Sequence, residues 1–253
     1  MRRTTMAATV AAALCAHGPS AAAGEFVPVT DAMLENPAAE QWLSWRRTTD
    51  SWGYSPLDQI DRDNVHQLGL VWAMPLNEGP QQGTPLVHEG VMYMPQPGDI
   101  IAAVDAATGD PIWEYARRWP ADLQTSFVRH PYIKRNIAIY DNLIIGASGD
   151  AFIYALDATS GELVWEREVL DFRTHPTQQS SGPIIAGGRV ISGRNCGPEG
   201  GPESCVIVAH DARTGDELWS TRTIPAPGEP GDETWGEVPW EQRWHVGAWL
   251  PPS

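Results

Sequence analysis

The sequence predicts an all-β fold assembled from β-propeller blades, and three observations support this prediction. A phrase of the form Asp-x-x-[Thr/Ser]-Gly-[Asp/Glu]-x-x-Trp occurs three times at intervals of about 50 residues, a period typical of propellers and other repeat arrays. Strand-like runs flank each copy, and a Trp stands at the same place in each period. The three copies are Asp105–Trp113, Asp157–Trp165 and Asp211–Trp219.

Each copy has the chemistry of a turn between two strands. The Asp carboxylate can accept hydrogen bonds from nearby backbone N–H groups, and Gly adopts a positive φ at no steric cost. A strand-like run precedes each Asp, and the Trp begins the next strand. The preceding runs are Ile100–Val104, Phe152–Leu156 and Val206–His210.

Further strand candidates complete each period. They follow turns that contain Gly, Asn or Asp, which is a hairpin signal, and they are Val91–Met94, Asn142–Ile145 and Arg189–Ser192. About four short strands in each period match one propeller blade. We therefore expect blades over residues 73–115, 116–167 and 168–221, with one Trp of each period packed between adjacent blades. These packing residues are Trp72, Trp113, Trp165 and Trp219.

Two non-repeating segments precede the blades. Residues 1–23 have a basic start, an apolar run and small residues at the end, as in a secretory signal peptide, and the run is too short to span a membrane. We therefore expect export to the periplasm, with lipid attachment at Cys15 as a poorly matched alternative. Residues 24–72 form a lead-in, in which Thr30 would cap a short helix and Ala38–Arg47 would begin a second one.

The C-terminal part departs from the repeat. Residues 224–239 are rich in Pro, Gly and acidic residues, which predicts a long exposed loop. With about fifty residues to a blade, the chain supplies about four blades, and its last residues contain no closing strand. We therefore expect residues 73–253 to be the N-terminal part of a longer propeller.

Charge and cysteine content narrow the classes of partner. The net charge of −15 argues against nucleic acid and suits a basic electron-transfer partner. Cys196 and Cys205 would form a disulfide in an oxidising compartment, with a metal pair as the alternative. No Cys-x-x-Cys-His motif for covalent haem occurs, and we expect no transmembrane helix in the mature chain.

A signature in the lead-in points to a family. Ser55–Ile60 (Ser-Pro-Leu-Asp-Gln-Ile), followed by Asn64-Val65, Leu68 and Trp72, resembles the N-terminal signature of the pyrroloquinoline quinone (PQQ)-dependent alcohol and methanol dehydrogenases. The repeated phrase is similar to the blade-docking motif of that family, and the resemblance covers about residues 40–253.

The resemblance implies an eight-bladed propeller that holds PQQ in its central channel, with a Ca²⁺ or lanthanide ion between quinone and protein. It also implies a periplasmic enzyme in which an alcohol-type substrate passes a hydride to PQQ. The electrons would then leave to a periplasmic acceptor such as a cytochrome c.

Four positions are candidates for PQQ binding on this resemblance. Gln82 stands where the family has a Glu, Arg135 where it has an Arg, Ser180 in its hydroxyl-bearing segment, and Trp249 at its stacking Trp. An amide can bond a quinone or carboxylate oxygen, a guanidinium donates a planar fork to the same groups, and a flat ring suits stacking. The alternatives are a polar turn residue for Gln82, a solvated pair with Lys134 for Arg135, and another inter-blade packing Trp for Trp249.

Two acidic residues are candidates for the metal ion. Glu199 and Glu203 lie in a Gly-rich loop, which can wrap a hard cation with oxygen ligands. The family's own Glu aligns with Pro198, and a solvated acidic loop is the alternative. The family's adjacent cysteine pair is also absent, with Arg and His at 129–130 instead, and its Asn ligand and catalytic Asp are expected after the last residue of this sequence.

The rival hypothesis is a non-enzymatic propeller that acts as a binding or assembly scaffold, because such proteins share the blade phrase. A scaffold would not require Arg135, Trp249 or the Ser-Pro-Leu lead-in. It is favoured by Gln82 and by the missing cysteine pair. A relative that binds PQQ without turnover is a third possibility.

Overall fold

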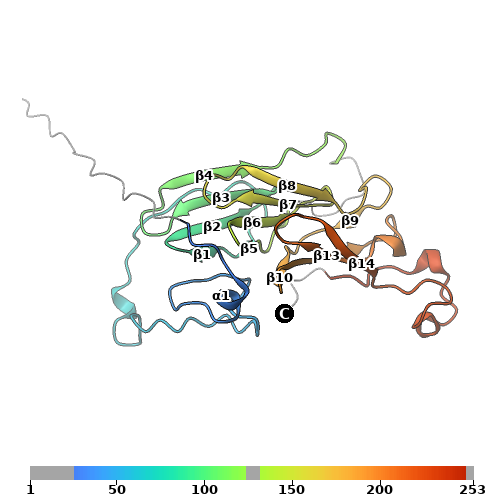
Figure 1. The fold of residues 1–253 in the computed structure, drawn as a ribbon, viewed down its shortest axis with the longest axis horizontal. Coiled ribbons are helices and arrows are strands. Elements are labelled where there is room, and N and C mark those ends of the chain that lie inside the picture. The colour runs from blue at the N-terminus through green and yellow to red at the C-terminus, as the bar shows by residue number, and fades with distance from the viewer. Residues whose placement is uncertain (1–25, 124–131, 249–253) are drawn as a thin grey trace, which may run out of the picture.

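The computed structural model describes residues 26–123 and 132–248, which form three four-stranded antiparallel sheets (Figure 1). In each sheet the strands follow one another in chain order, so each sheet is a meander with the topology of a propeller blade. The first blade contains β1 (Leu86–His88), β2 (Val91–Gln96), β3 (Ile100–Asp105) and β4 (Pro111–Ala116). The second contains β5 (Ala138–Tyr140), β6 (Leu143–Ala147), β7 (Phe152–Asp157) and β8 (Leu163–Glu168). The third contains β10 (Ile184–Ala186), β11 (Arg189–Gly193), β13 (Val206–Asp211) and β14 (Glu217–Arg222).

The remaining elements are short. Strands β9 (Thr177–Gln178) and β12 (Asn195–Cys196) pair with each other beside the third blade. The helices are α1 (Asp31–Glu35), η1 (Val65–Gln67), η3 (Pro202–Ser204), η4 (Asp232–Trp235) and η5 (Trp240–Gln242). About four blades were expected, and the described residues form three. The lead-in and the segment after β14 contain no blade strand. No helix among these residues is long and apolar enough to cross a membrane.

The repeated phrase forms the predicted turn in all three blades. Asp105 Oδ1 accepts hydrogen bonds from the backbone N–H groups of residues 107 and 108 at 2.9 and 2.8 Å. Asp157 and Asp211 accept the equivalent pairs at 2.9–3.0 Å. The Gly of each copy has a φ of 73–76°, which is a left-handed conformation that Gly adopts without strain.

Three of the four predicted packing residues, Trp72, Trp113 and Trp165, each pack on the Gly turn of the next blade. Trp219 does not, because no further blade lies beside it among the described residues, and it is 41% exposed. A Cβ atom added to Gly109 would lie 2.6 Å from the ring of Trp72, and one added to Gly161 would lie 2.7 Å from the ring of Trp113. The indole Nε1 atoms of these two Trp residues donate to the carbonyls of residues 106 and 158. Trp165 packs on Gly215 in the same way. Every residue of β6 is buried, because the second blade has a neighbour on each side.

The lead-in lies along the first strands of the blades (Figure 1). The predicted helix after Thr30 is present as α1, and the Thr30 hydroxyl accepts a hydrogen bond from Met33 N. The second predicted helix, over 38–47, is wrong. Trp42 instead exchanges two backbone hydrogen bonds of 2.9 Å with Val87 of β1, and pairing with a strand requires an extended backbone.

The segment after β11 is closed by the predicted disulfide between Cys196 and Cys205, and both residues are fully buried. Trp235 and Trp240 pack against this disulfide cluster. Much of 224–239 is exposed, as predicted, but Arg243 fixes the loop through an ion pair of 2.5 Å with Asp232.

Candidate functional site

Backbone contacts bring three of the predicted site segments together. The segment of Gln82 forms a parallel bridge to that of Arg135 through Gln81 and Lys134, and Thr84 N donates to Arg135 O at 2.8 Å. The strand entry of the third blade joins the same place, because Gly182 N donates to the Asn136 side chain at 2.7 Å and Asn136 donates back to Pro183 O. These segments lie at the ends of the blades opposite to the Asp-x-x-Thr-Gly turns.

The predicted PQQ residues differ in burial. Gln82 is exposed, Arg135 is half-buried and Ser180 is 7% exposed. Burial lowers the pKa of Arg135 from its ordinary value. Trp249 lies outside the described residues, as do positions 129–130. Ala248 accepts a hydrogen bond from the Ser181 hydroxyl at 3.4 Å, so the last described residue of the chain lies beside the Ser180 segment.

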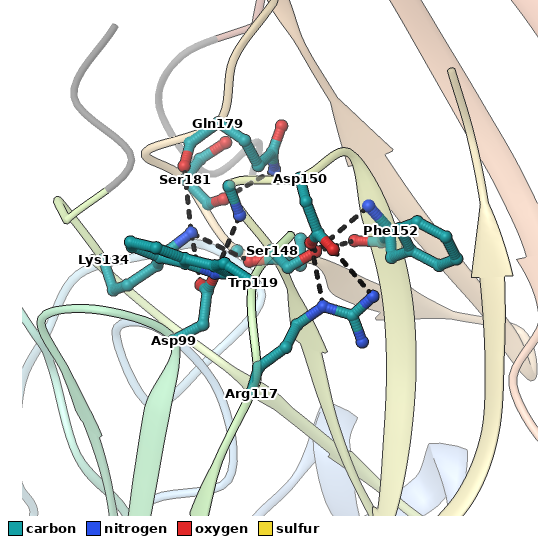
Figure 2. A network of polar contacts seen from close by, with 12 residues as sticks. Asp99, Arg117, Trp119, Lys134, Ser148, Asp150, Phe152, Gln179 and Ser181 are labelled. Atoms are coloured by element: carbon teal, nitrogen blue, oxygen red, sulfur yellow. Dashed lines mark hydrogen bonds and ion pairs between the residues drawn. The ribbon is translucent and has the colours of Figure 1, made fainter. Parts of the chain in front are cut away.

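A network of buried charged residues lies next to these segments (Figure 2). Lys134 Nζ is 2.5 Å from Asp99 Oδ1, and it also donates to the carbonyls of Ala147 and Gln179 at 3.2 and 3.3 Å. Trp119 Nε1 donates to the other oxygen of Asp99 at 2.7 Å. Lys134 is therefore buried rather than part of a solvated pair, and burial lowers its pKa.

A second ion pair continues the network. Arg117 donates to both oxygens of Asp150 at 2.8 and 3.0 Å, and Ser148 donates to the same carboxylate (Figure 2). Burial alone would lower the pKa of Arg117, but hydrogen bonds to Asp150 and Glu166 raise it above its ordinary value. We call Asp99, Arg117, Lys134, Asp150 and Arg194 the buried cluster; the electrostatic effects of Asp99 and Asp150 reach Arg194.

Sequence reasoning missed the buried cluster, although a signal was present. Gly98-Asp99 and Gly149-Asp150 occupy the same turn of successive blades, each just before the third strand. A carboxylate repeated at one point of a blade indicates a ring of charges at one end of the propeller. Lys134 is also the single Lys of the chain, and its burial has no local sequence signal.

The predicted metal residues lie in a separate hollow. Glu199 and Glu203 are exposed and line a pocket of about 270 Å³ together with His175 and Glu241. Glu203 Oε2 is 3.5 Å from His175 Nε2. Within 26–123 and 132–248, no group of three or more His, Cys, Asp or Glu side chains is arranged to hold a metal ion. The metal role of the two Glu residues stays a prediction.

A further pocket, of about 250 Å³, is apolar and lies between the lead-in and the first strands β5 and β10. Leu43, Trp45, Ile137 and Ile185 are among its lining residues. None of the predicted site residues lines it.

Comparisons with known proteins agree with the fold and with the predicted family. The model of the β-propeller domain of PQQ glucose/ethanol/alcohol dehydrogenases matches residues 42–253. The dehydrogenase subunit of the quinone alcohol dehydrogenase of Gluconacetobacter polyoxogenes is 35% identical over 98% of this chain and 35% of its own length. The 1-butanol dehydrogenase (cytochrome c) of Thauera butanivorans is 32% identical over 70% of this chain and 25% of its own length.

Among solved structures, the quinohemoprotein alcohol dehydrogenase ADHIIG of Pseudomonas putida superposes with a TM-score of 0.77 at 29% identity. That match covers 88% of this chain and 34% of the solved chain, so the sequence spans about a third of the length of these relatives. The blade turns, the docked Trp rings and the match over 42–253 lead to one conclusion: the chain belongs to the PQQ-dependent alcohol dehydrogenase family and carries part of its β-propeller domain.

Proposed function

We propose that this chain supplies PQQ-binding residues of a quinoprotein that oxidises an alcohol-type substrate. The observation that carries the proposal is the meeting of the Gln82, Arg135 and Ser180 segments at one end of the blades. The activity of the whole protein belongs to the proposal, because the sequence spans only about a third of its relatives.

The residues present fit an acidic cofactor. PQQ carries carboxylates and quinone oxygens, all of which accept hydrogen bonds. Arg135 offers a fixed fork of donors that stays charged, and its partial burial would strengthen an ion pair with a carboxylate. The Ser180 hydroxyl and the Gln82 amide add uncharged donors beside it. The neighbouring Lys134 is buried and paired with Asp99 at 2.5 Å, so Arg135 is the cation of this segment that can meet a carboxylate of the cofactor.

These residues would bind and orient the cofactor rather than carry out the redox step. PQQ, when bound, supplies the hydride acceptor, while the protein contributes position and electrostatics. Arg135 would fix one edge of the ring system, and Ser180 would fix another from the third blade. Since Asn136, which follows Arg135, exchanges hydrogen bonds with Gly182 and Pro183 in the Ser180 segment, the fold sets the spacing between the two donors.

The described residues do not fit a complete metal site. PQQ together with Ca²⁺ or a lanthanide is typical of the family, and Glu199 and Glu203 are the predicted ligands in this chain. Two exposed carboxylates with a neighbouring His do not make a closed oxygen shell for such an ion. We assign no step of the reaction to a metal ion here.

We also propose that the protein acts in the periplasm and passes electrons to a cytochrome c. The signal-like residues 1–23 and the disulfide between Cys196 and Cys205 support the oxidising compartment. The name of the Thauera relative includes cytochrome c, and the net charge of −15 would attract a basic partner.

A titration with PQQ tests the proposal. PQQ should quench the Trp fluorescence of the 253-residue chain, with and without Ca²⁺. Arg135→Gln should weaken binding about tenfold or more, because a hydrogen bond to a charged group contributes about 1.5–3 kcal/mol. Arg189→Gln, on the exposed face of β11, is the matched control and should bind like the wild type. Absence of quenching in the wild type would exclude this role.

A further inference from the structure

Arg194 is a buried cation with two nitrogens that lack a partner. Its side chain follows β11 and is 0% exposed. Nη2 donates to the Phe152 carbonyl at 3.5 Å, whereas Nε and Nη1 have no hydrogen-bond partner among the described residues. Burial lowers the pKa of Arg194 to about 10, so the side chain is still charged at neutral pH. A charged donor left in this state is costly to a folded protein.

The neighbouring carboxylates are already paired with other cations. Asp99 is already paired with Lys134 at 2.5 Å, and Asp150 already receives two hydrogen bonds from Arg117. Arg117 also pairs with the partly exposed Glu166 at 2.7 Å, so each of these carboxylates already has a cation, and Arg194 is the cation of the buried cluster without an ion pair of its own.

Arg194 lies between the predicted cofactor segments. Its neighbour Ser192 accepts a hydrogen bond from Gln179, which directly precedes Ser180. On the other side, a Cβ atom added to Gly247, two residues before Trp249, would lie 2.5 Å from Asn195 Cα. The backbone around Arg194 therefore packs against Gly247 and lies close to the Ser180 segment.

We propose that the Arg194 guanidinium binds a carboxylate group of an anionic ligand. The ligand is PQQ, and in this respect the inference rests on the proposed function. A carboxylate suits the site because Arg donates charge-assisted hydrogen bonds to planar acceptors, and because Nε and Nη1 of Arg194 are two such donors without a partner among the described residues. Arg194 then favours an acidic cofactor over an uncharged one and contacts it from the buried side. Arg135 contacts the cofactor from the half-exposed side.

The first test compares the thermal stability of the full chain with that of Arg194→Met, which keeps an unbranched apolar stem but removes the charged guanidinium. Arg189→Met, on the exposed end of the same strand, is the control. Without ligand, Arg194→Met should melt at the same temperature as the wild type or higher, because an uncompensated buried charge has been removed. PQQ should raise the melting temperature of the wild type and of Arg189→Met by similar amounts. It should raise the melting temperature of Arg194→Met clearly less.

The second test measures the dissociation constants of PQQ and of its trimethyl ester by equilibrium dialysis. Arg194→Met should bind PQQ about tenfold more weakly than the wild type. The ester, which lacks the negative charges, should bind both proteins alike. The inference is overturned if Arg194→Met melts well below the wild type and binds PQQ as tightly as the wild type does.

A failure of the proposed function has a different signature. In that case the wild type would not bind PQQ, yet acetate would raise the melting temperature of the wild type and not that of Arg194→Met. This result would keep the carboxylate site and assign it to a small free anion. If neither PQQ nor acetate stabilised the wild type, the carboxylate site itself would be excluded.

Discussion

At the scale of single residues, Lys134 joins all three blades through one ammonium group. It pairs with Asp99 of the first blade and donates to carbonyls at Ala147 in the second blade and Gln179 at the entry to the third. A buried ion pair adds little net stability compared with an apolar pair of the same size. Removal of one partner is nevertheless strongly destabilising, because it leaves the other charge uncompensated.

Lys134→Met should therefore lower the free energy of unfolding by about 3–5 kcal/mol, as measured by urea denaturation. Arg173→Met is the control, because Arg173 pairs with Asp122 at 2.6 Å while both side chains are half-exposed, and its loss should be much smaller because water screens the pair. Adding Asp99→Asn to Lys134→Met should recover part of the loss. Similar losses for Lys134→Met and Arg173→Met would contradict the three-blade role of Lys134.

At the scale of elements, the turn and the docked ring form one unit. Gly161 combines a φ of +73° with a Trp113 ring that leaves no room for a Cβ atom. Gly90, in the turn between β1 and β2, has a φ of +78° and open space around it. The two positions thus separate the backbone requirement for Gly from the packing requirement.

Gly90→Ala should destabilise the protein by about 1–2 kcal/mol, because only the left-handed conformation is penalised. Gly161→Ala should cost clearly more, because Trp113 must also move away from its turn. Thermal unfolding followed by near-UV circular dichroism, which reports on Trp packing, would measure both changes. Equal losses would mean that the ring contributes nothing at this turn.

The elements also explain what the sequence could and could not predict. The turn of Asp157 and Gly161 was predictable because its hydrogen bonds join residues a few positions apart. The helix expected over 38–47 was wrong because a distant strand, β1, pairs with Trp42. The ion pair of Asp99 and Lys134 joins two blades, so it depends on packing that no local pattern encodes.

At the scale of the whole molecule, residues at the two ends of the row of three blades are more exposed than the equivalent residues in the middle. Leu70-Val-Trp72 repeats the sequence of Leu163-Val-Trp165 in β8, yet Leu70 is 86% exposed and belongs to none of the three sheets. At the other end Trp219 is 41% exposed, whereas Trp165 is 6% exposed on its Gly turn. Equivalent residues therefore have different energetic roles in this chain.

Trp165→Ala should lower the free energy of unfolding by about 3–5 kcal/mol, as expected for a buried aromatic residue. Trp219→Ala should cost less than half as much, because much of its ring already contacts solvent. Chemical denaturation of the two variants under identical conditions measures the difference. Equal losses would show that the contribution of a Trp to stability does not depend on whether a further blade covers it.

The place of the chain's only lysine has a practical consequence for observing blade motion. Its side-chain amine lies where the three blades meet, and no other lysine competes for amine-directed chemistry. Acylating reagents reach this nitrogen only in molecules whose blades have separated, so the rate of mass gain at this one peptide counts opening events. Because this lysine is buried, the folded chain cannot be attached to an amine-reactive surface through a lysine side chain.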